Sequence, residues 1–304
     1  MSKRGAIGIT CVVLLINGAV ACGESTQVDI PSSKAASSTG ETAQDVTEPL
    51  HTTNQFDDWG DSFLPIAQVS IYLDGEVNPD EFPYQREWMP ASIMVISDGE
   101  ITHQGRIGIH VRGNTSRDFD KKSYAFETWN EDDEDLDVAL LGLPAEEDWV
   151  LQGPFSDKTL IRNHLIYQLS RDIGRYAART RFIELEINSD YRGVYVLMEK
   201  IKRDDVRVAL PEGAALLKRD WVEGGEQFIQ TTACRDDLKV EWSDDINEVV
   251  TRLDSIEAEL LNGDFSSIDL DSFIDHMLLV EVGRNVDGLS LIHISRAHET
   301  VVYL

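Results

Sequence analysis

Apolar and polar residues alternate over the first ordered stretches of the chain. Val69, Ile71 and Leu73 occupy every second position, and an Asp-Gly pair follows them. An apolar run at residues 93–96 and a second alternation at residues 107–111 come next, separated by the turn signal Ser97-Asp98-Gly99. A period of two residues is typical of strands with one buried face, and short turns join antiparallel neighbours. The pattern predicts a strand-rich, largely antiparallel beginning.

The period then changes to that of an amphipathic helix. Ser156 is a suitable N-cap, and Gly174 stands where such a helix commonly stops. We predict a helix between them that buries the apolar stripe Leu160, Ile161, Leu165, Leu169 and Ile173. A hairpin follows, with strands at residues 183–187 and 194–198 and a turn at 188–193. Together these elements predict a mixed sheet with one long helix packed on it.

The second half of the chain has helical periods. Ser243-Asp244 precedes a helix with apolar positions from Ile246 to Leu260, and a second helix is predicted from Asp269 to Val282. The predicted fold class is therefore α+β, with a strand-rich lobe at residues 63–200 followed by a partial helical lobe at residues 201–289.

The amino terminus has the pattern of an export signal. Lys3 and Arg4 precede an apolar stretch that ends in Ala19-Val20-Ala21-Cys22. This arrangement resembles a lipobox, so residues 1–21 are predicted to be a lipoprotein signal peptide and Cys22 the lipidated residue. Ordinary secretion with a chance cysteine is the alternative. Residues 22–62 are rich in Ser, Thr and acidic residues, and we expect a disordered tether.

The formal net charge of -28 restricts the partners. Long-range attraction to nucleic acid or to anionic lipid is excluded, so we expect membrane contact through the lipid anchor alone. Of the three cysteines, Cys11 leaves with the leader and Cys22 carries lipid, which leaves Cys234 without a partner for a disulfide. The carboxylate run at residues 131–137 lacks the glycine and spacing of a calcium loop and is interpreted as a solvated insertion.

Three short segments could carry chemistry. The segment Arg112-Gly113-Asn114-Thr115-Ser116-Arg117 offers backbone N-H groups, hydroxyls and guanidinium groups of the kind that surround phosphate. Lys121 and Lys122 follow it at the start of a strand, where a solvated pair is the alternative. Asn285 and Asp287 are two residues apart at the end of the last helix, suited to a hydroxyl nucleophile or magnesium, or simply to capping.

These pieces resemble, in their order, the CotH family of atypical, spore-coat-type protein kinases. The resemblance extends from about Leu64 to Asp287. It is carried by the following motifs: Arg112-Gly113-Asn114-Thr115-Ser116, Lys121-Lys122-Ser123-Tyr124, Leu141-Gly142-Leu143-Pro144, Asp148-Trp149-Val150-Leu151, Ser156-Asp157-Lys158, Leu160-Ile161-Arg162-Asn163, Arg179-Thr180-Arg181-Phe182-Ile183-Glu184-Leu185, Tyr191-Arg192-Gly193-Val194-Tyr195, Glu199-Lys200-Ile201-Lys202-Arg203 and Asn285-Val286-Asp287.

The resemblance implies a divergent, kinase-like two-lobe fold that binds ATP and magnesium. It further implies transfer of the γ-phosphoryl group to serine or threonine of protein substrates on the envelope or surface. The family's phosphate-binding residues correspond to the loop residues Arg112, Asn114 and Ser116, followed by Lys121 or Lys122.

The remaining implied roles belong to the end of the strand-rich lobe and to the helical lobe. Glu199 is grouped with these cofactor-binding residues, although it corresponds to a position near the connection between the lobes. Asp287, with Asn285 in the same motif, corresponds to the catalytic or metal-associated aspartate.

The sequence departs from the family pattern after Asp287. The family continues into a second, Trp-Asp-x-Asp-like metal motif that this chain lacks, so we expect the chain to be truncated and inactive by itself. Residues 290–304 resemble translated adapter sequence, and we interpret them as a non-native tail. A non-catalytic structural or adhesion module of the cell surface is the alternative function.

Overall fold

The structure is a computed structural model that describes residues 66–75, 87–113, 115–219, 225–232 and 237–283, and the backbone of residues 300–303. Five residues to which the sequence gives a role lie outside this part of the chain: Cys22, Asn114, Cys234, Asn285 and Asp287. The predicted leader, tether and most of the tail also lie outside it. Among the described residues, no helix is both long and apolar enough to cross a bilayer.

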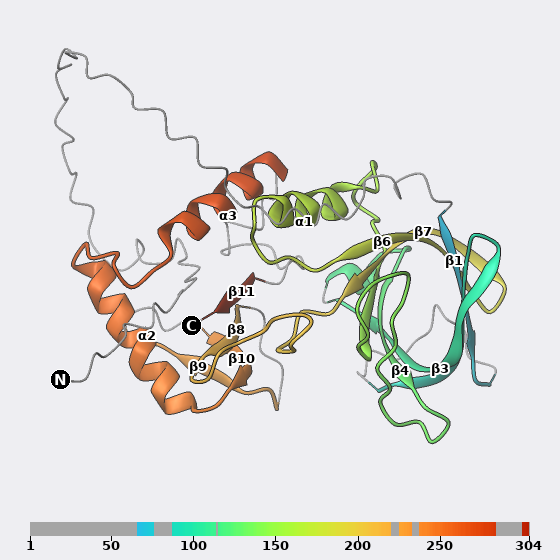
Figure 1. The fold of residues 1–304 in the computed structure, drawn as a ribbon, viewed down its shortest axis with the longest axis horizontal. Coiled ribbons are helices and arrows are strands. Elements are labelled where there is room, and N and C mark those ends of the chain that lie inside the picture. Colours follow the sequence, from blue (N-terminus) through green and yellow to red (C-terminus); the bar gives the residue numbers. More distant parts are fainter. Residues whose placement is uncertain are drawn as a thin grey trace, which may run out of the picture. The chain divides into compact units, whose positions relative to one another are not determined.

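Seven strands form a closed barrel (Figure 1). Their order around the barrel is β1-β2-β3-β4-β5-β7-β6, and neighbours are antiparallel except for the parallel pair β1 and β6, which closes it. The strands are β1 (Ala67–Leu73), β2 (Met89–Ser97), β3 (Glu100–Arg112), β4 (Ser123–Trp129), β5 (Asp148–Gln152), β6 (Thr180–Ile187) and β7 (Asp190–Glu199).

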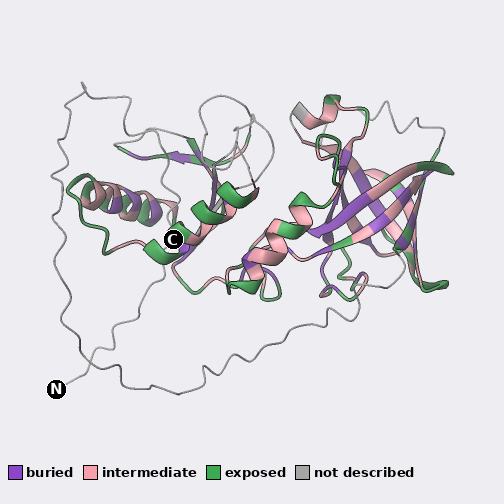
Figure 2. Cartoon of the chain, turned by 90° about the horizontal axis from the view of Figure 1, so that it is seen from above, coloured by how far each residue is buried: buried purple, intermediate pink, exposed green. Residues whose placement is uncertain are grey.

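The predicted alternations supply the interior of the barrel. Val69 and Ile71 of β1, and Ile107 and Ile109 of β3, are at most 2% exposed and belong to one apolar cluster. Figure 2 shows the barrel strands coloured largely as buried or intermediate. The strand-rich, largely antiparallel beginning is therefore confirmed, and its sheet is closed rather than open.

The β6–β7 hairpin turns more tightly than predicted. Ile187 pairs with Asp190, so only Asn188 and Ser189 form the turn, both with positive φ, at 51° and 66°. Such a two-residue turn matches the twist of the flanking strands. Gly193 is not part of the turn, because it lies within β7 next to a register shift and has φ of 84°.

The long helix α1 (Arg162–Asp172) starts later than predicted and buries a different face. Asp157, not Ser156, accepts hydrogen bonds at its beginning, from the Thr159 and Arg162 backbone N-H groups. The predicted stripe is largely exposed, with Ile161, Leu165 and Ile173 at 42–49%. The presence of a helix and its stop at Gly174, with φ of 82°, are confirmed.

The face of α1 that packs on the outside of the barrel is more polar than the stripe. Tyr167 contacts an apolar cluster of Val150, Val196 and Met198. His164 lies 4.7 Å from the Phe182 ring and pairs through Nδ1 with the Thr180 hydroxyl at 2.7 Å. Polar atoms that find partners on the barrel therefore replace part of the expected apolar contact.

The second half of the chain contains a small sheet that the sequence did not predict. Its order is β11-β8-β10-β9, formed by β8 (Ala215–Arg219), β9 (Phe228–Gln230), β10 (Asp237–Ser243) and β11 (Thr300–Tyr303). All of its pairs are antiparallel. The region predicted as a partial helical lobe therefore contains a sheet as well as helices, and the α+β class is confirmed.

Both helices predicted for this half are present. They are α2 (Ile246–Leu261) and α3 (Leu270–Gly283). Asp245 caps α2 by accepting hydrogen bonds from the Asn247 and Glu248 backbone N-H groups. Val249, Leu253 and Ile256 of α2 pack on Leu217 and Ile229 of the small sheet. Their spacing is the predicted helical period.

Position 108 in the barrel wall must be glycine, because the Trp129 side chain occupies the space that a larger residue would need. A Cβ atom added to Gly108 of β3 would lie 2.1 Å from Cζ2 of Trp129 on β4. We predict that Gly108→Ala lowers the free energy of unfolding by about 2 kcal/mol, because the indole must leave its site. Denaturant unfolding measures the change.

Gly105→Ala on the same strand is the matched control. Its added Cβ would meet only the His103 side chain, at 3.1 Å, which can rotate away. Equal losses in the two variants would contradict the assignment to Trp129.

Candidate functional site

Basic residues collect at one end of strands β3, β4, β5 and β7. Arg112 ends β3 opposite Ser123, and the 3-10 helix η3 (Thr115–Asp118) leads to Lys121 and Lys122 directly before β4. The register of β5 with β4 and β7 brings Gly153 and the beginning of β7, where Arg192 lies, to the same end. The structure therefore places Arg112, Ser116 and the two lysines at the same end of the barrel.

The Lys121 ammonium is half-buried and lacks a carboxylate neighbour among the described residues. Its Nζ donates to the Arg192 carbonyl at 3.2 Å and lies 4.5 Å from the centre of the Tyr195 ring. Burial lowers the pKa of Lys121. Keeping the Lys121 ammonium charged in this half-buried position therefore costs free energy, and a bound anion would offset that cost.

Lys122 organises the preceding loop. Its Nζ donates to the Arg117 carbonyl at 2.8 Å, while its own carbonyl accepts from the Tyr195 hydroxyl at 2.9 Å. Gly153 crosses here so closely that an added Cβ would lie 2.6 Å from the Lys122 carbonyl oxygen. The backbone between the two lysines and β4 is therefore fixed by β5 and β7.

An aromatic pair lies in the loops beside these lysines. Phe119, which follows η3, stacks on Phe155 with ring centres 4.8 Å apart. Phe155 is 39% exposed, and the Lys158 ammonium lies 5.9 Å from its ring centre. The two phenylalanines offer a flat apolar surface next to basic groups.

Glu199 lies at the other end of the same strands. It pairs with Trp149 at the beginning of β5, four residues along β7 from Tyr195, which corresponds to about 13 Å of strand. Its side chain is fully buried and forms an ion pair with Arg179 at 2.7 Å. The structure therefore does not bring Glu199 together with the two lysines.

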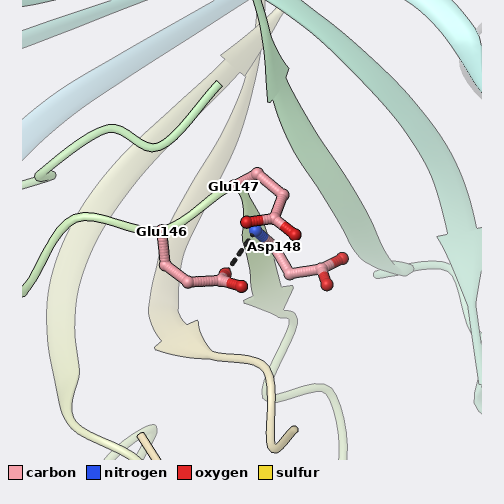
Figure 3. A group of neighbouring side chains, drawn as sticks. All are labelled: Glu146, Glu147 and Asp148. Atoms are coloured by element: carbon pink, nitrogen blue, oxygen red, sulfur yellow. Dashed lines mark hydrogen bonds between the residues drawn. The ribbon is translucent and has the colours of Figure 1, made fainter. Parts of the chain in front are cut away.

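A cluster of three carboxylates precedes and begins β5 at this second end. Figure 3 shows Glu146, Glu147 and Asp148, whose carboxylate oxygens lie within 4.8 Å of one another. This spacing would suit a metal ion. However, the Lys202 ammonium already meets all three, at 2.5, 2.6 and 2.9 Å. The cluster is an ion-pair network around a lysine.

Arg207 completes the network from the inside. Its side chain is fully buried and pairs with Glu146 at 2.9 Å, and it donates to the Asp148 and Lys200 carbonyls. Burial raises the pKa of Glu146 to about 7, against the opposing effect of Lys202 and Arg207. Burial also acts on Glu147, but hydrogen bonds, first that from Lys202, lower its pKa to about 2.

The sequence did not predict a role for several residues at the two ends of the barrel strands. Arg192 and Tyr195 lie in the quoted Tyr-Arg-Gly-Val-Tyr motif, yet no role was predicted for them, because only the β7 register brings them to Lys121. Phe155 and the carboxylates at 146–148 were missed too. Asn114, Asn285 and Asp287 lie outside the described residues, so their predicted roles remain predictions.

The buried network makes a prediction about pH. Arg207→Met should lower the free energy of unfolding by about 3 kcal/mol at pH 8, because Glu146 loses a buried partner. A carboxyl whose folded pKa is raised, here from 4.5 to about 7, stabilises the fold below pH 4.5 and loses that contribution as the pH rises through 7. The deficit of the variant should therefore shrink between pH 8 and pH 5.

Lys200→Met serves as the comparison. Its ammonium pairs with Asp148 at 2.8 Å but is 43% exposed, so a loss below about 1 kcal/mol is expected. Denaturant unfolding at the two pH values measures both variants. A deficit for Arg207→Met that is independent of pH would mean that the charge of Glu146 does not cause it.

Comparison with known proteins supports the resemblance seen in the motifs. A search of curated proteins found no match. The family described as CotH kinase protein matches residues 109–303, nearly two thirds of the chain. The match includes both ends of the barrel strands described above and the small sheet with its helices. The chain belongs to the CotH family.

Proposed function

We propose that this chain is the kinase-like region of an exported protein that transfers the γ-phosphoryl group of ATP to serine or threonine of envelope or surface proteins. The barrel acts as the amino-terminal lobe of a divergent two-lobe kinase, and the small sheet with α2 and α3 belongs to the second lobe. A lipid on Cys22 holds the protein at the membrane. Family membership supports the reaction class.

The observation that carries the proposal is the half-buried Lys121 ammonium without an ion pair among the described residues. The chain has 55 acidic residues and only 27 lysines and arginines. In such a protein a basic group readily finds a carboxylate, as Lys202 does. The Lys121 ammonium loses solvation through burial and has the second lysine, Lys122, next to it in the chain, which favours an anionic ligand such as phosphate.

A nucleotide fits the chemistry of this end of the barrel. ATP, when bound, supplies the phosphoryl group. Lys121 and Lys122 hold its phosphates and offset their charge, and backbone N-H groups near Gly113 and the Ser116 hydroxyl add hydrogen bonds. The part of the Phe155 ring that Phe119 leaves exposed stacks on the base.

Magnesium does not fit the carboxylate cluster at residues 146–148, because Lys202 fills it. We assign no metal role to that cluster. The family resemblance implies that Asp287, with Asn285 in the same motif, is the catalytic or metal-associated aspartate. In the proposed reaction Asp287 orients the acceptor hydroxyl and accepts its proton.

The first test is the removal of the Lys121 charge. Lys121→Met should weaken ATP binding at least tenfold, which is about 1.4 kcal/mol, because a charge-assisted bond to phosphate is lost. The free energy of unfolding should stay equal or rise slightly, because a half-buried charge is removed. Titration calorimetry with ATP and magnesium, and thermal unfolding, measure the two effects.

Lys239→Met is the matched control for Lys121. This lysine pairs with Glu226 at 2.8 Å on the small sheet and should not affect ATP binding. A protein that binds no ATP, or whose ATP affinity is unchanged in Lys121→Met, contradicts the proposed site and favours a non-catalytic surface module. If Lys121→Met instead unfolds the protein, the lysine is structural.

A second test separates the base from the phosphates. Phe155→Ala should weaken ATP binding about tenfold and leave tripolyphosphate binding unchanged, because stacking involves only the base. Phe265→Ala, which removes another exposed phenylalanine, should change neither affinity. Equal losses for ATP and tripolyphosphate in Phe155→Ala would mean that the ring supports the loop instead.

A further inference from the structure

The Tyr195 ring faces the Lys121 ammonium from inside the barrel. Tyr195 is 1% exposed and belongs to the apolar cluster of the interior. Its ring centre lies 4.5 Å from Nζ of Lys121, within the distance at which an aromatic face attracts a cation. This attraction is stronger for a cation that has lost part of its hydration, and the Lys121 ammonium is half-buried. The ring therefore helps to keep the ammonium charged and in place.

Strand β7 supplies both described partners of this ammonium. The Arg192 carbonyl accepts from Lys121 Nζ at 3.2 Å, and Tyr195 lies three residues further along the same strand. Gly193, between them, leaves room for the lysine, because an added Cβ would lie 3.3 Å from Nζ. Gly153 at the end of β5 closes the other side, since its added Cβ would lie 3.1 Å from the Tyr195 ring and 3.2 Å from Cγ of Lys121.

Helix α1 packs on the opposite face of β7. Val196 follows Tyr195 in the chain, and neighbouring residues of a strand point to opposite faces. Val196 belongs to the cluster outside the barrel against which Tyr167 of α1 packs. The single carboxylate of α1, Asp172, accepts from the Gln168 side chain at 2.7 Å. The lysine and the helix therefore lie on different sides of the same strand.

This arrangement differs from that of typical protein kinases. In those enzymes a glutamate on a helix forms an ion pair with the phosphate-binding lysine, and the position of that helix controls activity. In this chain a strand of the barrel presents an aromatic face and a carbonyl oxygen to Lys121. Neither group carries a charge, so both orient the ammonium and leave its full positive charge for a ligand.

We infer that Tyr195 is a positioning residue for nucleotide binding: from inside the barrel it holds the Lys121 ammonium in place, so the affinity for ATP does not depend on helix α1. The inference rests on the proposed function, and it concerns the regulation of the same site. A lysine that is held by a strand of a closed barrel stays in position whether or not α1 moves.

Two rings of nearly the same shape test the contact. Tyr195→Phe keeps the negative face of the ring, whereas Tyr195→pentafluorophenylalanine, introduced by codon suppression, reverses it, and both variants lack the hydroxyl. In the full chain with magnesium, titration calorimetry should show that the fluorinated variant binds ATP about fivefold more weakly than Tyr195→Phe. Thermal unfolding should give the two variants equal midpoints, so that the difference in affinity is not a loss of folding.

The same two rings in the Lys121→Met background complete a double-mutant cycle. Without an ammonium over the ring, the two rings should bind ATP with equal affinity. A difference that persists without Lys121 would mean that the ring acts on another part of the site, and it would overturn the inference.

Phe126→pentafluorophenylalanine is the matched control. Phe126 is also 1% exposed and belongs to the same interior cluster, so its fluorination tests the effect of a fluorinated ring in the barrel. It should leave the affinity for ATP unchanged. An equal loss in this variant would assign the effect to the barrel interior in general and overturn the role of Tyr195.

A variant of α1 tests the second half of the inference. Tyr167→Ser removes the ring that packs on the outer cluster, so hydrogen exchange of the α1 amides should become faster. The affinity for ATP should stay the same, because Lys121 is held from the other face of β7. A large loss of ATP affinity in Tyr167→Ser would make α1 a determinant of the site and contradict the inference.

The outcomes separate the inference from the proposed function. If the protein binds ATP and Lys121→Met weakens this binding, but the two rings at position 195 give equal affinities, the inference is overturned and the proposed function stands. If the unaltered protein binds no ATP, the proposed function fails and the inference with it.

Discussion

The parallel pairing of β1 with β6 is the constraint on which the barrel depends. It joins residues 67–71 to residues 183–187 and turns six antiparallel neighbour pairs into a closed surface. Closure fixes the stagger of the strands, so each strand end has a defined neighbour. Lys121, Gly153 and Arg192 meet because of that stagger, and Glu146 and Lys202 meet at the opposite end for the same reason.

The two ends of the barrel differ in the partners of their charged groups. At the Glu146 end, each described carboxylate of the network faces a cation, and the arrangement is complete without a ligand. At the other end, the ammonium groups of Lys121 and Lys122 face carbonyl oxygens and an aromatic ring, which satisfy them as donors without bringing a negative charge. The first arrangement is typical of a structural ion-pair network, and the second of a site for an anion.

The sequence predicted local structure well and long-range pairing poorly. Alternation identified β1, β3 and β6, because their inward residues fill the barrel. The buried face of α1 was predicted wrongly, because His164 and Tyr167 find partners on the barrel that apolar periodicity does not reveal. β9 was missed because a strand of three residues has no readable period. β10 is as long as β1, but Leu238 is its only buried residue, so its burial does not alternate.

The candidate site shows the same contrast between residues that are close in sequence, which were predicted together, and residues that only strand register brings together, which were not. The motif order was enough to bring Arg112, Ser116, Lys121 and Lys122 to one place, because they are neighbours in sequence. Glu199 was grouped with them, although four residues of β7 separate it from their end of the barrel. Arg192, Tyr195 and Phe155 could not be assigned beforehand, because their proximity to Lys121 depends on strand register and loop contacts.

Barrel closure also affects the order in which the chain can fold. Ile183, the first partner of Ala67, is made 116 residues after it. At a synthesis rate of about 5 to 20 residues per second, roughly 6 to 23 s pass before that partner exists. During this time one edge of β1 has unpaired backbone groups and its apolar side chains lack the far wall of the barrel. A newly made chain therefore carries an open, apolar sheet edge for seconds, which is the form in which cellular chaperones would meet it.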